Sequence, residues 1–185
     1  PSWLNGAQIV LERAAGNAAD LRIGMVVVVE GERAPGGATG TAQRVEYEAE
    51  IEGPISALTL VSPDVLHATI LGQTVVVERD LTRFDGSPPP TFDTLAVNDL
   101  VEVSGFRRTA DIQATYLKKK GVAGGTPAVD LKGTVAGVAG RSFLLGTITV
   151  TWDASTTLKD LPSGGPMNGD FVSVEGTLTA PDAIS

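Results

Sequence analysis

The sequence predicts an all-β protein made of tandem copies of one small module. Three observations predict this fold class: a nine-residue motif recurs three times, segments with the pattern of an amphipathic helix are nearly absent, and 22 of the 185 residues are glycine. Valine and threonine, which are abundant, pack well on a pleated surface, and glycine supplies the turns between short strands. Because 42% of the residues are apolar and only 19% are charged, we expect a folded core.

The recurring motif is a turn, a strand with alternating valines and a final glycine, and it occupies residues 23–31, 97–105 and 168–176. Because successive strand side chains point to opposite faces, the valines share one face, which we expect to be core. These residues are Val27, Val29, Val101, Val103, Val172 and Val174. We expect Glu102 and Ser173 on the other face to be solvated. The final glycine permits a bend or bulge that a Cβ would hinder.

Other strands recur around this motif. A strand that starts at a glycine turn precedes it in every copy, at residues 6–11, 72–77 and 146–151. An opening strand is recognisable in the second and third copies alone, at residues 52–57 and 132–137. A closing strand is recognisable in the first and second copies alone, at residues 41–48 and 113–118.

These patterns divide the chain into three modules. Residues 1–50 form a partial module without its start, residues 51–125 a complete module, and residues 129–185 a module without its closing strand. A module of about five strands must hide two sheet edges, and closing the sheet is the common solution. We therefore expect tandem OB-like barrels, with small β-sandwiches as the alternative. The unpaired edges of the two end modules predict self-association through them.

The strand motifs of the second copy resemble those of a bacterial family, the domain of unknown function 5666. They are found at residues 51–55, 71–77, 95–105 and 114–115, with Thr82 between them. The resemblance covers residues 51–118 and 131–180 well and residues 4–47 partly. It implies a barrel-like fold and an exported bacterial protein with periplasmic, cell-surface or secreted location. It implies no activity and no catalytic residue. Met25 stands where the family usually has Asp, which fits a turn role.

Charge and composition exclude several classes of partner. The formal net charge is −8, and such a field repels nucleic acid and anionic membranes. There is no cysteine, so disulfides, thiolate metal sites and cysteine nucleophiles are excluded. No apolar run is long enough to span a bilayer and no signal peptide is recognisable, so we expect no membrane insertion. Because the chain begins at Pro1, we expect a processed or trimmed piece.

The residues with the chemistry of a catalytic or metal site are isolated from one another. His67 is the only histidine, and it alternates with apolar neighbours as an outward strand residue would. Asp99 and Asp170 recur at equivalent places, but calcium needs several oxygens in one loop. We interpret both aspartates as turn-stabilising residues. We therefore predict no catalytic, cofactor-binding or metal-binding residue, and no cofactor.

Three other segments and the two tryptophans invite a functional interpretation. The glycine-rich stretches 35–40 and 121–126 lack the helix and the Lys-Ser/Thr pair of a phosphate-binding loop, so we expect a hairpin tip and a linker. The proline-rich segment 85–92 is either an ordered, rigid loop, which we favour, or an extended recognition segment. Trp3 and Trp152 are expected in the core rather than in a sugar-stacking platform.

The segment 45–52 alternates strictly between apolar residues and glutamates. This pattern predicts a strand-like junction between the first two modules, with an acidic stripe on one face. Lys118, Lys119 and Lys120 followed by glycines form the second junction, which we expect to be less stiff than the first.

The functional hypothesis that fits these observations is a non-catalytic structural or interaction module of an exported bacterial protein. The alternative is a barrel that binds a saccharide or a peptide. An enzyme would need residue types that the chain nearly lacks.

Overall fold

The computed structural model describes residues 6–37, 39–162 and 164–185, and the part it describes is all-β. The first module contains β1 (Gln8–Leu11), β2 (Ala14–Ala15), β3 (Val27–Arg33) and β4 (Gly40–Tyr47). The middle module contains β5 (Ile51–Ser62), β6 (Val65–Ile70), β7 (Gln73–Glu78), β8 (Arg83–Gly86), β9 (Asp99–Arg107) and β10 (Ile112–Val122). The third contains β11 (Ala128–Ala139), β12 (Ser142–Leu145), β13 (Ile148–Thr151), β14 (Phe171–Ala180) and β15 (Ala183–Ile184).

Helical structure is limited to short 3-10 segments in this part of the chain. They are η2 (Ala18–Asp20) and η3 (Phe92–Thr94). Across the described residues, no helix has the length and apolar character needed to cross a membrane.

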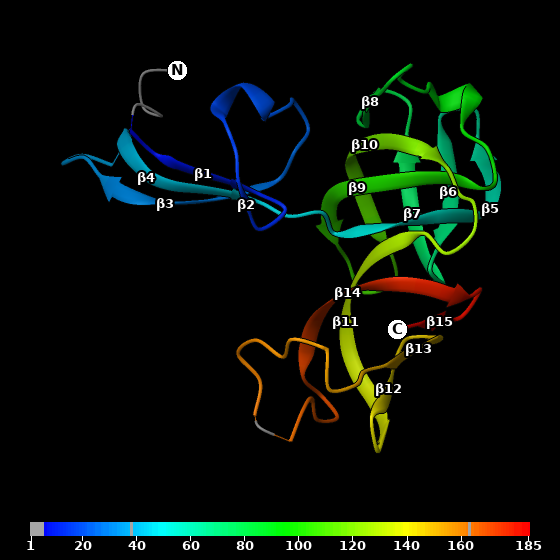
Figure 1. The fold of residues 1–185 in the computed structure, drawn as a ribbon. Coiled ribbons are helices and arrows are strands. Elements are labelled where there is room, and N and C mark those ends of the chain that lie inside the picture. The colour runs from blue at the N-terminus through cyan, green and yellow to red at the C-terminus, as the bar shows by residue number, and fades with distance from the viewer. Residues whose placement is uncertain (1–5, 38, 163) are drawn as a thin grey trace.

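Five strands of the middle module pair in a closed circuit (Figure 1). β5 pairs antiparallel with β6, and β6 pairs antiparallel with β7. β7 pairs in parallel with β10, β10 pairs antiparallel with β9, and β9 returns to β5. Every strand of this circuit therefore has a partner on both sides, and the module leaves few backbone groups unpaired.

The third module repeats the same circuit, and three of its strands, β12, β13 and β15, are shorter than their counterparts. β11 pairs with β12, β12 with β13, and β14 with β11, all antiparallel. β15 closes the circuit, because it pairs in parallel with β13 and antiparallel with β14. The prediction that this module lacks its closing strand is therefore wrong. β15 is two residues long, which is too short for a periodic pattern to indicate it.

The first module has four strands in the order β2-β1-β4-β3. β1 pairs in parallel with β4, and β4 pairs antiparallel with β3, as β7, β10 and β9 do in the middle module. Within the described residues it has no counterpart of β5 or β6. Its core is correspondingly small, with Ile9, Ala42 and Val45 buried together.

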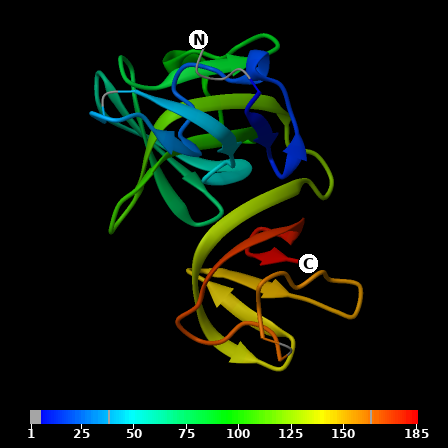
Figure 2. The same cartoon turned by 90° about the vertical axis from the view of Figure 1, so that its left-hand side faces the viewer.

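The middle and third modules share one continuous sheet. The start of β5 pairs antiparallel with β11, through Ile51 opposite Leu131 and Glu52 opposite Asp130. Since the same two residues of β5 also pair with β9, and those of β11 with β14, the strands run β9-β5-β11-β14 across the boundary. In Figure 2 the third module, coloured yellow to red, lies below the other two.

The predicted burial of the motif valines is confirmed for the middle module and for Val172, is partial for Val27 and Val174, which are half-buried, and fails for Val29. Val101 and Val103 are fully buried, and Val172 of the third module is 9% exposed. Val29 is 50% exposed, although it occupies the position of Val103. The reason is the missing neighbour: β9 is covered by β5, whereas no described strand lies beside β3 on that edge.

Candidate functional site at the junction of the three modules

The turn between β1 and β2 carries two charged residues into the junction. Glu12 and Arg13 both have a left-handed backbone conformation, with φ of 46° and 63°. The amide of Glu12 donates a hydrogen bond of 2.9 Å to the carbonyl oxygen of Tyr47, which anchors the turn to the end of β4. This conformation is uncommon for residues other than glycine, so the tertiary contacts of the turn must stabilise it.

Arg13 connects the first module with the third. Its Nε lies 3.2 Å from Oε1 of Glu48, in the link between β4 and β5. Its Nη2 lies 3.2 Å from Oδ2 of Asp130, and its Nη1 lies 2.5 Å from Oε1 of Glu175. Nη2 also donates to Oγ of Ser173 at 2.9 Å. A single guanidinium therefore contacts β11, β14 and the first interdomain link, as its fork of donors allows.

Tyr47 connects the first module with the middle one. Its hydroxyl donates a hydrogen bond of 2.7 Å to Oε1 of Glu102, and both residues are buried. Lys120 lies on the other side, with Nζ 2.8 Å from Oε1 of Glu52 and 3.9 Å from Oε2 of Glu102. The prediction that Glu102 is solvated is wrong, because the first module covers that face of β9. Ser173 is exposed as predicted.

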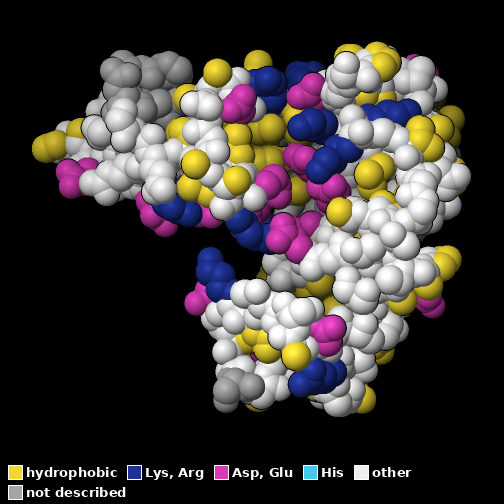
Figure 3. Space-filling view, in the orientation of Figure 1, with side chains coloured by type: hydrophobic (Ala, Val, Ile, Leu, Met, Phe, Trp, Pro, Cys, Tyr) yellow, Lys and Arg dark blue, Asp and Glu magenta, His cyan; other side chains and the backbone are white. Residues whose placement is uncertain are grey.

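Four acidic residues stand side by side across the shared sheet. The register places Glu102 opposite Glu52, Glu52 opposite Asp130, and Asp130 opposite Glu175. Like charges directly opposite one another destabilise a sheet unless cations compensate them. Arg13 and Lys120 supply that compensation. Figure 3 shows acidic and basic side chains gathered where the modules meet.

Glu12 is a residue of the junction whose pKa lies near neutral pH. Burial raises the pKa of its carboxyl from 4.5 to about 7. A hydrogen bond of 2.7 Å from the amide of Ala49 lowers the pKa, whereas the carboxylates of Glu102, Asp130 and Glu52 raise it further. The turn of the first module at the junction therefore carries a group whose charge changes near neutral pH and whose ionised form is repelled by carboxylates of the other two modules.

We expect the junction to weaken as Glu12 ionises. Because its folded pKa lies above its unfolded value, its contribution to stability is fully present below about pH 4.5 and is lost as pH rises through about 7. The difference in free energy of unfolding between the wild-type chain and Glu12→Gln should fall across this range and level off above it. Urea denaturation of both proteins from about pH 4 to about pH 9 measures it. A flat or rising difference would contradict this assignment.

The predicted alternation of the acidic stripe at residues 45–52 is confirmed. Val45, Tyr47, Ala49 and Ile51 are buried, and the glutamates between them are half-buried. Each glutamate is paired with a cation, as shown by Glu46 with Arg44, Glu48 with Arg13 and Lys132, Glu50 with Arg107, and Glu52 with Lys120. Two of these pairs, Glu48 with Lys132 and Glu50 with Arg107, join different modules, and the others lie within one module.

The isolated residues behave as turn and strand residues. Oδ2 of Asp99 accepts from the amide of Ala96 at 3.1 Å, and Oδ2 of Asp170 accepts from the amide of Met167 at 2.8 Å, which confirms the turn role. His67 lies in β6 and is half-buried. No three His, Cys, Asp or Glu side chains of the described residues are grouped as metal ligands.

The two glycine-rich stretches lie where the sequence places them. The predicted hairpin tip 35–40, apart from Ala38, spans the connection between β3 and β4 and ends at Gly40, the first residue of β4. The predicted linker 121–126 starts within β10, which ends at Val122, and residues 123–127 connect β10 and β11. Trp152 packs against the core, with its ring 5.6 Å from that of Phe143, as predicted. Trp3 lies outside the described residues.

The role of Arg13 was not predicted from the sequence, because a single arginine beside a glutamate forms no recognisable motif.

A comparison with protein families assigns two of the modules to a known family. A family model described as "Domain of unknown function (DUF5666)" matches residues 52–118 and 132–184. The chain belongs to this family. No curated protein and no solved structure matches the chain.

The two DUF5666 units coincide with the middle and third modules. Each one runs from its opening strand, β5 or β11, to the strand that closes its circuit, β10 or β15. Three of the four aligned acidic residues, Glu52, Glu102 and Glu175, lie within the matched residues, and Asp130 lies two residues before the second match. Arg13, which compensates two of them, comes from the first module outside the matched residues.

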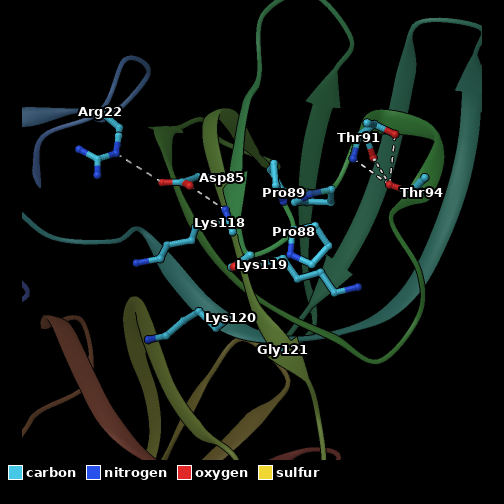
Figure 4. Close-up of a pocket in the computed structure, with 13 residues that line it drawn as sticks. Arg22, Asp85, Pro88, Pro89, Thr91, Thr94, Lys118, Lys119, Lys120 and Gly121 are labelled. Atoms are coloured by element: carbon cyan, nitrogen blue, oxygen red, sulfur yellow. Dashed lines mark hydrogen bonds and ion pairs between the residues drawn. The ribbon is translucent and has the colours of Figure 1, made fainter.

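The first DUF5666 unit also borders a cavity of about 870 Å³ beside its proline-rich loop (Figure 4). The lining includes the loop from Asp85 to Thr91, the end of β10 from Lys118 to Gly121, and Arg22 and Thr94. A hydrogen bond from Tyr116 to Asp85 holds the pKa of this carboxyl below its ordinary value.

The cavity gathers positive charge on an otherwise acidic protein. Figure 4 shows Lys118 and Lys120 on one side of β10 and Lys119 on the other. Lys119 pairs with Asp99 at 2.6 Å, and Lys120 pairs with Glu52 at 2.8 Å. Lys118 forms no ion pair with the residues that the structure describes. The proline-rich loop forms a concave surface with the end of β10.

Proposed function

We propose that the chain is a non-catalytic structural or interaction module of an exported bacterial protein, and that its complete modules are OB-like barrels. The observation that carries the proposal is the junction: one sheet spans the two DUF5666 units, and Arg13 and Tyr47 join the first module to both. Such a junction keeps three modules in one arrangement, as a spacer or scaffold requires. The export part rests on the family resemblance alone.

The barrel assignment is supported by the strand order. In both DUF5666 units the five strands form one circuit with a single parallel pair, β7 with β10 and β13 with β15. A five-stranded Greek-key order that returns to its first strand is the arrangement of small OB-type barrels. A sandwich of two sheets would leave edge strands, which this order avoids.

We expect Arg13→Ala to release the first module from the other two. The substitution leaves the largely buried Asp130 without its guanidinium partner and should cost about 1 to 2 kcal/mol of unfolding free energy. In ¹⁵N relaxation measurements, residues 8–47 should then tumble faster than residues 51–184. The wild-type chain should show one common rotational correlation time.

Arg33→Ala is the matched control, because Arg33 is exposed near the tip of β3 and forms no ion pair with the described residues. It should leave the common correlation time unchanged. Separate correlation times in the wild-type chain would argue against a rigid spacer, and an unaltered common correlation time in Arg13→Ala would show that Arg13 is not needed to hold the modules together.

A saccharide- or peptide-binding barrel is the second candidate, and the cavity of Figure 4 favours it. The excess of lysines suits an acidic ligand, and the prolines of the loop offer a rigid apolar wall. Amide shift changes confined to the cavity lining upon addition of an acidic oligosaccharide or peptide would favour this candidate over the first.

A further inference from the structure

The first module has a sheet edge that the described residues leave open. β3 pairs with β4 on one side, and no other described strand pairs with it. Val28 is 63% exposed and Val29 is 50% exposed on this strand. An edge strand with free backbone groups and exposed valines is a template for another strand.

The other two modules show what covers the equivalent edge. In the middle module β9 pairs antiparallel with the opening strand β5, through Val103 opposite Ile51 and Val101 opposite Gly53. In the third module β14 pairs antiparallel with the opening strand β11. The covered valines Val101 and Val103 are fully buried. The open edge of β3 is thus equivalent to the edge that an opening strand covers in both of the other modules.

We propose that the edge of β3 is a binding site for the opening β-hairpin of a DUF5666 unit, of the kind formed by β5 and β6. The register follows from the middle module: the residue equivalent to Ile51 lies opposite Val29, and the one equivalent to Gly53 lies opposite Val27. Backbone pairing provides the binding energy, and the apolar face of the hairpin packs beside Val27 and Val29, which share one face of β3. The inference rests on the proposed interaction role, which it extends to a particular partner.

A second copy of the chain is a poorer occupant of this edge. Its two opening hairpins, β5 with β6 and β11 with β12, already lie in closed circuits with partners on both sides. Either hairpin would have to leave its own module, and the fully buried Ile51, Ile55 and Leu131 would be exposed. Self-association through this edge, which the sequence analysis predicted, is therefore treated as an alternative outcome of the experiment that follows.

The test adds a synthetic peptide of residues 51–70 to the ¹⁵N-labelled whole chain. We expect amide shift changes in β3 and at least a tenfold slower hydrogen exchange of those β3 amides that do not bond to β4. A peptide with Ile51→Asp and Ile55→Asp has the same length and should not bind. Val29→Asp in the chain should abolish binding without unfolding the module, since Val29 is half exposed.

Three outcomes would overturn the proposal. The first is no protection of β3 at saturating peptide. The second is protection confined to β9, because the peptide would then be replacing β5 in the middle module. The third is protection of β3 that appears without peptide and grows with chain concentration, which would assign the edge to a second copy. The first outcome leaves the common correlation time of the modules unchanged, and self-association lengthens it for all modules together, so neither is mistaken for release of the first module.

Discussion

Replacing Gly105 with alanine should lower the free energy of unfolding by about 3 kcal/mol, because a methyl group has no space at this position. A Cβ there would overlap the carbonyl oxygen of Gln113 and lie 2.9 Å from its carbonyl carbon and 3.0 Å from Cα of Ala114. Gly105 pairs with Ala114, next to a register shift in the β9–β10 ladder. Both strands would have to separate to admit the side chain.

Gly124 provides the matched control, because it lies in the linker and an added Cβ would meet no atom within 4 Å. Gly124→Ala should change stability by only a few tenths of a kcal/mol. Urea denaturation followed by far-ultraviolet circular dichroism measures both variants. Equal midpoints for Gly105→Ala and Gly124→Ala would show that the closing glycine is not needed for space.

Ile51→Ala should cost about 3 kcal/mol, because this fully buried side chain lies between Val103 of β9 and Leu131 of β11. The loss of a large buried side chain leaves a cavity at the boundary of the two DUF5666 units. We therefore expect both units to be destabilised together and to unfold in one transition.

Leu60→Ala on the same strand is the control, since Leu60 is 64% exposed and its truncation should be nearly neutral. Heat capacity measurements resolve whether one or two transitions occur. If Ile51→Ala lowers the melting temperature of one unit alone, the shared sheet does not couple them.

Features that depend on residues close in sequence were predicted correctly from the sequence. The motif strands and the turns at Asp99 and Asp170 depend on neighbours close in sequence, and the structure confirms them. A register shift lies at the closing glycine in the first two copies, at Gly31 and Gly105. Side-chain alternation and turn chemistry are local properties, so one sequence carries the information. The same reasoning could not place Arg13, whose partners in the third module are distant in sequence.

The sequence by itself determined the all-β class, the repeated strands and the family to which two modules belong. Only the tertiary structure decided which faces are covered. Glu102 is buried although it is a glutamate on the expected outer face, and Val29 is exposed although it is a valine on the expected inner face. The physical reason is the same for both: burial of a strand residue depends on which strand or module lies against it, and a repeat motif does not encode its neighbours.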